Sequence, residues 1–484
     1  MIDFSKVTID PSWALKVPPA IAMRRLALPL CVVDGMLVVA MADPGDTQTL
    51  SAISRATQKA VQGEKADPAE LRSHLLRVYG DIRSAPSPIA ANDPVALVDS
   101  LLRAATLRRA SDIHFDPERD GVRVRLRVDG QLEDFMRIPQ ELQAPLCSRL
   151  KVMAGLDIAE RRAPQDGGFV WRMPSGVASG PFDIRVATLP VRYGERLTLR
   201  LLESGRDRRT LDALGLSAKH RAIFDKVLAS PHGLVLMTGP TGSGKTTTLF
   251  AAIRELLSRE PLNILTVEDP IEYEIEGVSQ VEVDSSDKVN FSKALRSLLR
   301  HDPDVIMIGE IRDSESLDTA VKAALTGHLV LSTLHTNDAV GAVARLSDMG
   351  LAAHLIAATL RISAAQRLVR TLCPDCREAC ELTEADARLL GDSSLAGQTA
   401  YRPHGCLACA GRGFLGRTGL FEMMAPDQEI ASLIASGAKE SDLLAALRQK
   451  GMRMLVEDAA EKVLSGVTSF HEAIRATGGA AFVR

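Results

Sequence analysis

The sequence has few aromatic residues, no long apolar run and no excess of positive charge. Aromatic residues make up 4% of the 484 residues, and 58 basic against 61 acidic residues give a net charge of −3. Proteins that follow single-stranded nucleic acid combine a basic groove with aromatic stacking surfaces, so this composition disfavours a nucleic-acid partner. No run approaches the ~20 apolar residues that a helix needs to cross a bilayer.

The strongest apolar segment, LALPLCVVDGMLVVAM, is interrupted by Asp34-Gly35 and predicts a hairpin of two strands. The N-terminus, MIDFSKVTIDPSW, lacks the basic-then-apolar layout of a secretory signal. We therefore expect a cytoplasmic protein that associates with a membrane only through a partner.

Cysteines are also few, and their spacing does not suggest a disulfide framework. Of the seven, four form two C-x-x-C pairs: Cys373, Cys376, Cys406 and Cys409. Such pairs fit a closed tetrahedral Zn²⁺ site made of thiolates in a reducing compartment. The long separation between the pairs predicts a zinc-stapled lobe over residues 371–420. Cys380 and His404 are nearby spare ligands, and a redox pair or metal-free thiols are the alternatives.

The length predicts two to four domains. Stretches with linker composition, SAPSPIAANDP at 84–94 and ESGRDRRT at 203–210, divide the chain into three parts. Residues 1–83 contain short strands and helices. Residues 95–202 include GVRVRLRV, an alternating strand with one apolar and one basic face. Residues 211–484 alternate apolar strands with helical stretches, which predicts an α/β fold with a largely parallel sheet.

The segment GLVLMTGPTGSGKTTTLF, residues 233–250, is the strongest functional signal. It is G-x-x-x-x-G-K-T between an apolar strand and a helix, the setting in which backbone N–H groups surround phosphates. Lys245 would place its charge on the β- and γ-phosphates, and the Thr246 hydroxyl would bind Mg²⁺. The strand–loop–helix setting disfavours an accidental glycine-rich turn. The predicted ATP-binding residues are Gly239, Pro240, Thr241, Gly242, Ser243, Gly244, Lys245, Thr246 and Thr247.

Two acidic strand ends follow, in NILTVEDPIEY and DPDVIMIGEIRD. The ends of parallel strands share the edge where ligands bind, so both carboxylates are expected beside the phosphate loop. Glu310 is placed to polarise the attacking water. Gly309 stands where an aspartate usually helps to hold Mg²⁺, so we expect Glu268, supported by Asp269, to supply negative charge near the metal. Taken alone, an acidic residue after a strand is commonly a helix cap.

The segment TGHLVLSTLHTNDA is a further buried strand between two histidines. A lone histidine is usually structural, and His328 fits that interpretation. His335 follows the strand on the expected nucleotide side, where it could sense the γ-phosphate.

These motifs, in this order, resemble the Walker A, aspartate box, Walker B and histidine box of the ATPases that drive type II secretion and type IV pilus assembly. The segments ASDIHF, RLKVMAGLDIAERRAPQDG and FDIRVATLPVRYGERLTLRLL resemble the second N-terminal domain of that family. The resemblance implies a RecA-like P-loop domain with a zinc-binding insertion. A PAS-like α+β domain and a small N-terminal α/β domain would precede it. Glycine before the Walker B glutamate is also the family's pattern.

The resemblance further implies a homohexamer in which ATP hydrolysis moves the N-terminal domain against the RecA-like domain. Arg185 and Arg200 match family arginines that approach the nucleotide from the N-terminal side. Arg296, Arg300 and Arg312 match others on the RecA-like domain. The alternative for each arginine is a surface ion pair.

Length and cysteine spacing resemble the type II secretion member. That similarity implies a motor at the inner membrane of a Gram-negative bacterium, with ATP, Mg²⁺ and Zn²⁺ as cofactors. Residues 1–83 would contact the cytoplasmic domain of the L-type platform component, and acidic phospholipid would stimulate the enzyme. One alternative is a type IV pilus or DNA-uptake pilus assembly ATPase. Another is a zinc-dependent nucleic-acid-binding protein, which the charge disfavours.

Overall fold

The computed structural model describes residues 1–79, 92–172, 181–203, 209–283 and 291–478. It divides into two compact units, which we consider separately. The first comprises Met1–Arg206, Leu372–Glu378 and Pro403–Gly416, and the second comprises Asp207–Thr371, Ala379–Arg402 and Arg417–Arg484. Most of the predicted linker at 84–94 and of that at 203–210 lies outside the described residues.

The first unit begins with a three-stranded sheet in the order β1-β2-β3, packed with short helices. The predicted hairpin is confirmed: β1 and β2 are antiparallel, and Val33 pairs with Met36. Asp34 and Gly35 form the turn with φ of 49° and 78°, the positive values that a tight hairpin requires. The elements are η1 (Phe4–Lys6), α1 (Pro11–Ala14), α2 (Pro19–Arg25), β1 (Ala27–Val33), β2 (Met36–Met41), α3 (Thr47–Thr57), β3 (Val61–Lys65) and α4 (Pro68–Tyr79).

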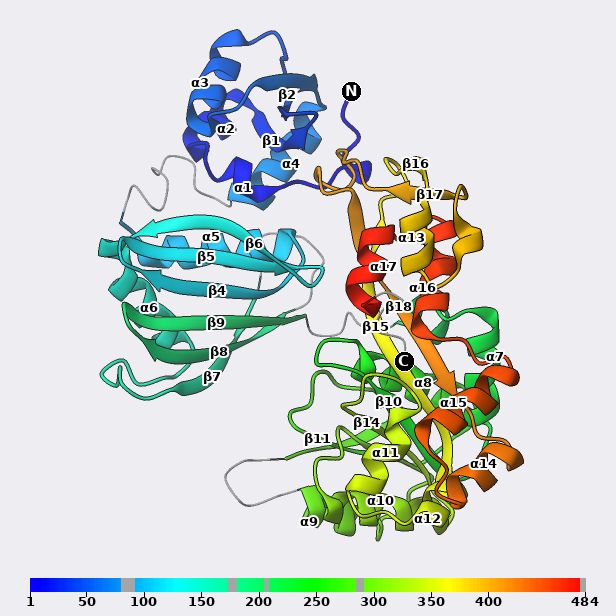
Figure 1. The fold of residues 1–484 in the computed structure, drawn as a ribbon. Helices are drawn as coiled ribbons and strands as arrows, with labels where there is room; N and C mark the ends of the chain where they lie inside the picture. Colours follow the sequence, from blue (N-terminus) through cyan, green and yellow to red (C-terminus); the bar gives the residue numbers. More distant parts are fainter. Residues whose placement is uncertain (80–91, 173–180, 204–208, 284–290, 479–484) are drawn as a thin grey trace. The chain divides into compact units, whose positions relative to one another are not determined.

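A six-stranded antiparallel sheet follows, in the order β6-β5-β4-β9-β8-β7. Helices α5 and α6 pack their apolar side chains on one face of it (Figure 1). The basic side chains of β5 lie on the other face and pair with acidic ones, as in the 2.7 Å contact of Arg125 with Asp116. The elements are α5 (Pro94–Leu107), β4 (Ala110–Glu118), β5 (Gly121–Val128), β6 (Gln131–Pro139), η2 (Gln140–Leu142), α6 (Gln143–Met153), β7 (Gln165–Trp171), β8 (Phe182–Val191) and β9 (Gly194–Glu203).

The second unit is built on a seven-stranded sheet in the order β12-β11-β13-β14-β10-β15-β18. The first six strands in that order are mutually parallel, which confirms the predicted α/β fold. Buried runs of Val, Ile and Leu suit strands covered on both faces. The strands are β10 (Gly233–Thr238), β11 (Ile264–Glu268), β12 (Val278–Glu282), β13 (Val305–Ile308), β14 (Leu329–Leu334), β15 (Leu360–Leu372) and β18 (Phe414–Met424).

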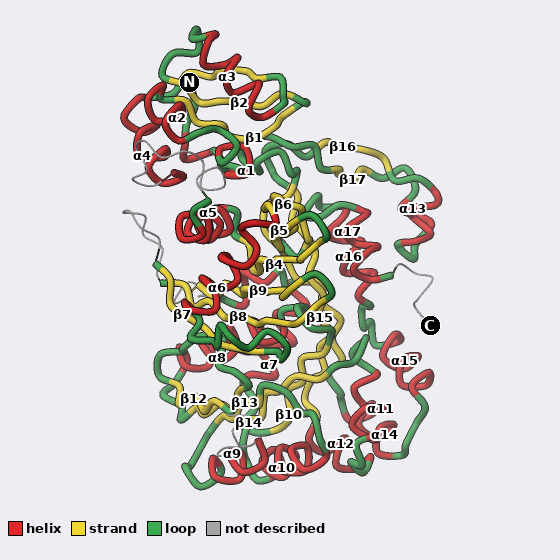
Figure 2. The backbone as a smooth tube through the Cα atoms, turned by 90° about the vertical axis from the view of Figure 1, so that its left-hand side faces the viewer, coloured by secondary structure: helices red, strands yellow, loops and turns green. Residues whose placement is uncertain are grey.

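Helices cover both faces of this sheet (Figure 2). One face packs against η3 (Leu211–Leu214), α7 (Ala218–Leu228) and α8 (Lys245–Arg259). The other packs against α9 (Phe291–Leu298), α10 (Ser314–Leu325), α11 (Gly341–Asp348) and α12 (Ala353–Thr359). This arrangement leaves the carboxyl ends of the parallel strands on one common edge.

Between β15 and β18 lie β16 (Glu378–Glu381), α13 (Glu384–Leu389), η4 (Ser393–Leu395) and β17 (Thr399–Arg402). After β18 come α14 (Gln428–Ala435), α15 (Glu440–Gln449), α16 (Leu455–Leu464) and α17 (Phe470–Thr477). Two buried carboxylates join β18 to α16. Asp458 accepts the N–H of Phe421 at 3.0 Å, and Glu422 accepts the N–H of Leu455 at 3.1 Å. Among the described residues, no helix has the length and apolar character needed to span a bilayer.

Candidate nucleotide and metal sites

The phosphate loop connects β10 to α8, as the sequence predicts. Gly239, Gly242 and Gly244 have φ of 142°, 78° and 89°, so L side chains there would be strained. A Cβ at Gly239 would lie 2.6 Å from the carbonyl oxygen of Gln366, and one at Gly244 would lie 2.8 Å from Gln366 Nε2. At Gly239 and Gly244 the loop therefore has room for backbone only.

The side chains of this loop fit a phosphate group. The Lys245 ammonium donates to the carbonyl oxygens of Gly239 and Pro240 at 2.7 and 3.1 Å. Burial lowers the pKa of Lys245, while Glu310 acts in the opposite direction. The buried Ser243 hydroxyl has no hydrogen-bond partner within the described part of the chain. Gly244 caps α8 without a side-chain hydrogen bond, so the positive helix end is available to an anion.

Glu310 and His335, which lie in separate sequence motifs, are brought together by adjacent strands. Glu310 follows β13, His335 follows β14, and Glu310 Oε2 lies 3.3 Å from His335 Nε2. Arg312 pairs with Glu310 and donates to Asp269 Oδ2 at 3.2 Å. The structure thus places three predicted motifs at one edge of the sheet, with Glu310 close enough to Lys245 to influence its pKa.

Glu268 is more enclosed than a simple acidic strand end. It is 2% exposed and accepts hydrogen bonds from Thr266 Oγ1 at 2.6 Å and Gln280 Nε2 at 2.9 Å. Burial raises the pKa of its carboxyl group. The neighbouring Asp269 is 39% exposed, so it is the more accessible carboxylate at the end of β11.

Two residues beside the phosphate loop were not singled out from the sequence. Gln366 of β15 is 1% exposed and accepts a hydrogen bond from Thr248 Oγ1 at 2.8 Å. Arg367 donates to the carbonyl oxygen of Asn337 at 2.8 Å, and its Nη1 lies 3.1 Å from the position of a Cβ at Gly239. Burial lowers the pKa of Arg367. The polar pair inside the apolar run AAQRLV is the sequence signal that could have identified them.

Two of the remaining candidates in the second unit, His328 and Arg296, have structural contacts. His328 precedes β14, away from the phosphate-loop edge, and its Nδ1 lies 3.0 Å from the carbonyl oxygen of Ala323 in α10. Arg296 pairs with Glu315 at 2.8 Å. Arg300 is exposed.

The two arginines predicted to approach the nucleotide lie in the first unit. Arg185 of β8 pairs in register with Arg200 of β9, which in turn pairs with the buried Asp112 of β4. Arg200 Nε donates to Asp112 Oδ1 at 3.1 Å, and Arg185 Nε lies 3.8 Å from Asp183 Oδ2. Their approach to a nucleotide remains a prediction.

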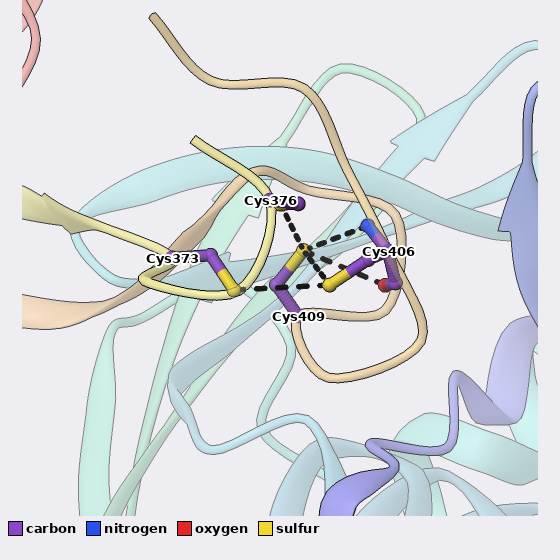
Figure 3. Close-up of side chains that lie close together, drawn as sticks. All are labelled: Cys373, Cys376, Cys406 and Cys409. Carbon is purple, nitrogen blue, oxygen red and sulfur yellow. Dashed lines mark hydrogen bonds between the residues drawn. The ribbon is translucent and has the colours of Figure 1, made fainter. Parts of the chain in front are cut away.

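Figure 3 shows the four paired cysteines converging. Their sulfur atoms all lie within 4.8 Å of one another. Three sulfur pairs are separated by 3.8 Å: Cys373–Cys406, Cys376–Cys409 and Cys406–Cys409. A tetrahedron with Zn–S bonds of about 2.3 Å has edges of about 3.8 Å, so the donor set fits Zn²⁺.

Backbone donors surround this cluster. The N–H groups of Gly405, Cys406 and Gly413 point to cysteine sulfur atoms at 3.3, 3.2 and 3.1 Å, contacts that orient thiolate ligands. The two spare candidates lie outside the four-residue group. His404 Nδ1 pairs with Glu378 at 3.1 Å, and Cys380 packs against the apolar core of the second unit.

The parallel sheet, the phosphate loop and the acidic strand ends define a P-loop nucleotide hydrolase of RecA-like fold. Residues 91–475 match the family described as Type II/IV secretion system protein, and residues 1–85 match the MshEN domain. The chain therefore belongs to the type II/IV secretion system protein family. Its family and its site identify it as an ATPase.

Individual relatives agree with this assignment. The type II secretion system protein E of Dickeya dadantii is 46% identical over 383 residues, which span 79% of this chain and 75% of that protein. The type IV pilus assembly ATPase PilB of Myxococcus xanthus is 37% identical over 501 residues, or 98% of this chain and 88% of that protein. The crystal structure of the pilus retraction motor PilT with bound ADP is similar at 26% identity. The matched region covers 79% of this chain and 98% of the PilT chain, with a TM-score of 0.54.

Proposed function

We propose that this ATPase is the motor that powers protein export through a type II secretion system by driving assembly of its pseudopilus. The observation that carries this proposal is the 46% identity to a type II secretion system protein E. A type IV pilus or DNA-uptake pilus assembly motor is the second candidate. It is favoured by a 37% identity to PilB that extends over 98% of the chain.

For the chemistry, we propose that the phosphate loop holds ATP through its backbone N–H groups, with Lys245 beside the β- and γ-phosphates. ATP with Mg²⁺ supplies the phosphoanhydride bond that is hydrolysed, and Thr246 is the protein ligand of the metal. Glu310 orients and polarises the attacking water, and the 3.3 Å contact with His335 keeps its carboxylate in place. Glu268 and Asp269 contribute negative charge around the metal without binding it directly.

For the metal site, we propose that Cys373, Cys376, Cys406 and Cys409 hold one structural Zn²⁺. The tetrahedral 3.8 Å sulfur spacing and the three backbone donors support this assignment over a redox pair. A thiolate zinc site contributes folding free energy directly, so the metal would fix the connection between β15 and β18.

For assembly, we propose a homohexamer at the cytoplasmic side of the inner membrane of a Gram-negative bacterium. In it Arg185 and Arg200 approach a nucleotide and stabilise charge on the γ-phosphate. Residues 1–83 contact the cytoplasmic domain of the L-type inner-membrane component, and acidic phospholipid stimulates hydrolysis.

Complementation in the source bacterium tests the proposed function. A strain lacking this gene should fail to release type II substrates into the medium, and wild-type protein should restore release. Lys245→Ala should not restore it. Lys322→Ala should, because Lys322 is an exposed residue whose ion pair, with Asp318, lies within one helix. Normal export in the deletion strain, together with loss of pili, would favour the pilus motor instead.

A further inference from the structure

Glu422 of β18 occupies an unusual place for an acidic side chain. It is 2% exposed, and its two oxygens bind different segments. Oε1 accepts the N–H of Ala339 at 2.8 Å, and Oε2 accepts the N–H of Leu455 at 3.1 Å. Ala339 belongs to the segment 335–340, here called the histidine loop, which carries His335. Leu455 is the first residue of α16.

The histidine loop has other ties on the side of the phosphate loop. Thr238, the last residue of β10, donates to the carbonyl oxygen of Asp338 at 3.3 Å. Arg367 donates to the carbonyl oxygen of Asn337 at 2.8 Å. Glu422 adds a further anchor from β18, and its second oxygen binds the first residue of α16. The loop is thus held between the nucleotide edge and α16.

Keeping a carboxylate in this position costs free energy that an apolar side chain of the same size would not cost. Within the described part of the chain, no lysine or arginine nitrogen forms an ion pair with it. Its charge is stabilised instead by two backbone N–H groups. Packing alone would not require a carboxylate here, whereas its two oxygens each accept one N–H from a separate segment.

We propose that Glu422 is a positioning residue for ATP hydrolysis, fixing the histidine loop to α16 so that His335 stays against Glu310. This inference rests on the proposed roles of Glu310 and His335. Glu422 touches neither the phosphate loop nor those two side chains. Its loss should therefore slow hydrolysis and leave nucleotide binding largely intact.

Protonation of the Glu422 carboxylate should slow ATP hydrolysis, as replacement of this residue should. Burial raises the pKa of Glu422 to about 7. The charged groups that face it are Asp338 of the histidine loop, Arg367 of β15 and Arg448 of α15. A protonated carboxyl group has one poor acceptor oxygen, so one N–H loses its partner as pH falls below neutrality. The kcat of the wild type should therefore fall as the pH drops below about 7. Glu422→Gln, which cannot be protonated in this way, should not show this fall in kcat at acidic pH.

The test compares Glu422→Gln with Asp458→Asn in the full-length protein. Both substitutions change a buried carboxylate at the junction of β18 and α16, but Asp458 accepts from Phe421 and Lys462 and does not contact the histidine loop. We expect Glu422→Gln to lower kcat about tenfold, with the KM for ATP changing less than about twofold. Asp458→Asn should lower Tm, while kcat per folded protein stays near the wild-type value.

Several results would overturn this role. One is a kcat in Glu422→Gln that equals that of the wild type. Another is a fall in kcat per folded protein in Asp458→Asn as large as that in Glu422→Gln. A third is a wild-type kcat that does not change between about pH 6 and pH 8. If Glu422→Gln does not fold, Glu422→Asp replaces it. The shorter carboxylate cannot reach both N–H groups, so kcat should fall at neutral pH and its further loss at acidic pH should be smaller than in the wild type. Glu310→Gln in the same assay separates the two hypotheses. Full activity there overturns the proposed site, on which the anchor rests, whereas a slow Glu310→Gln beside a fully active Glu422→Gln overturns the anchor alone.

Discussion

The carboxylate of Glu310 lies 3.3 Å from Nε2 of His335, across the adjacent parallel strands β13 and β14. This contact joins two motifs that the sequence presents separately. His335 contacts one carboxylate oxygen of Glu310, and Arg312 pairs with the other. A carboxylate held from two sides is oriented for one task, and orientation of the attacking water is the task that the phosphate loop requires.

Lys245→Ala should abolish ATP hydrolysis and keep the fold. The ammonium is buried and donates to two carbonyl oxygens of its own loop. Burial lowers its pKa, so the charged form costs folding free energy, and its removal should not lower Tm. We expect turnover to fall at least about 100-fold, because the charge on the β- and γ-phosphates is lost. Phosphate release and thermal unfolding measure the two effects, with Lys322→Ala as the control. Near-normal turnover would remove Lys245 from its assigned role.

Glu310→Gln should bind ATP but hydrolyse it slowly. The amide keeps the volume of the side chain but polarises water poorly, and general base catalysis typically contributes about 10²–10⁴-fold. Fluorescent ATP-analogue binding should give a Kd close to that of the wild type, while kcat falls within that range. Loss of nucleotide binding in this variant would make Glu310 a binding group, contrary to its proposed role.

Cys373→Ser with Cys376→Ser should release one zinc ion per chain and destabilise the segment around residues 371–420. Both sulfur atoms belong to the four-cysteine cluster. Structural zinc sites contribute directly to folding free energy, so Tm should fall while phosphate-loop chemistry survives in part. Cys380→Ser is the matched control, because Cys380 lies outside the cluster and should leave the zinc content unchanged. Elemental analysis that finds no zinc in wild-type protein purified without chelator would contradict the metal assignment.

Local patterns were enough to predict much of this protein. The buried strands, the glycine-rich loop and the Asp34-Gly35 hairpin depend on neighbouring residues, and the structure confirms all three. Each C-x-x-C brings its own two cysteines together locally, and the two pairs also converge. The sequence could not exclude Cys380 or His404 as ligands, since that depends on how the intervening segment folds.

Contacts between distant strands could not be predicted from the sequence. Gln366 and Arg367 reach the phosphate loop only because β15 lies beside β10 in the sheet order. Glu422 reaches the histidine loop through a backbone N–H, which has no signature in the sequence. The enclosure of Glu268 likewise depends on Gln280 of β12, an edge strand with no motif of its own.

Hydrolysis should rise more than linearly with protein concentration if Arg185 and Arg200 act when subunits assemble. The two arginines are adjacent in register on β8 and β9, so they form one basic spot on the charged face of the six-stranded sheet. A guanidinium beside the γ-phosphate would stabilise charge in the transition state. Because domain closure in a ring depends on neighbouring subunits, specific activity should fall on dilution. Acidic phospholipid vesicles and the inner-membrane partner should restore it.

Arg185→Ala and Arg200→Ala should each remove most of this concentration-dependent activity. Arg123→Ala is the control on the same sheet, since Arg123 forms an exposed pair with Asp134, and exposed pairs contribute little. Deletion of residues 1–83 should abolish recruitment by the partner and spare hydrolysis in concentrated protein. Specific activity that stays constant across dilution, with both arginine variants fully active, would refute the oligomeric mechanism. It would leave Arg200 as the ion-pair partner of Asp112 and Arg185 as the neighbour of Asp183.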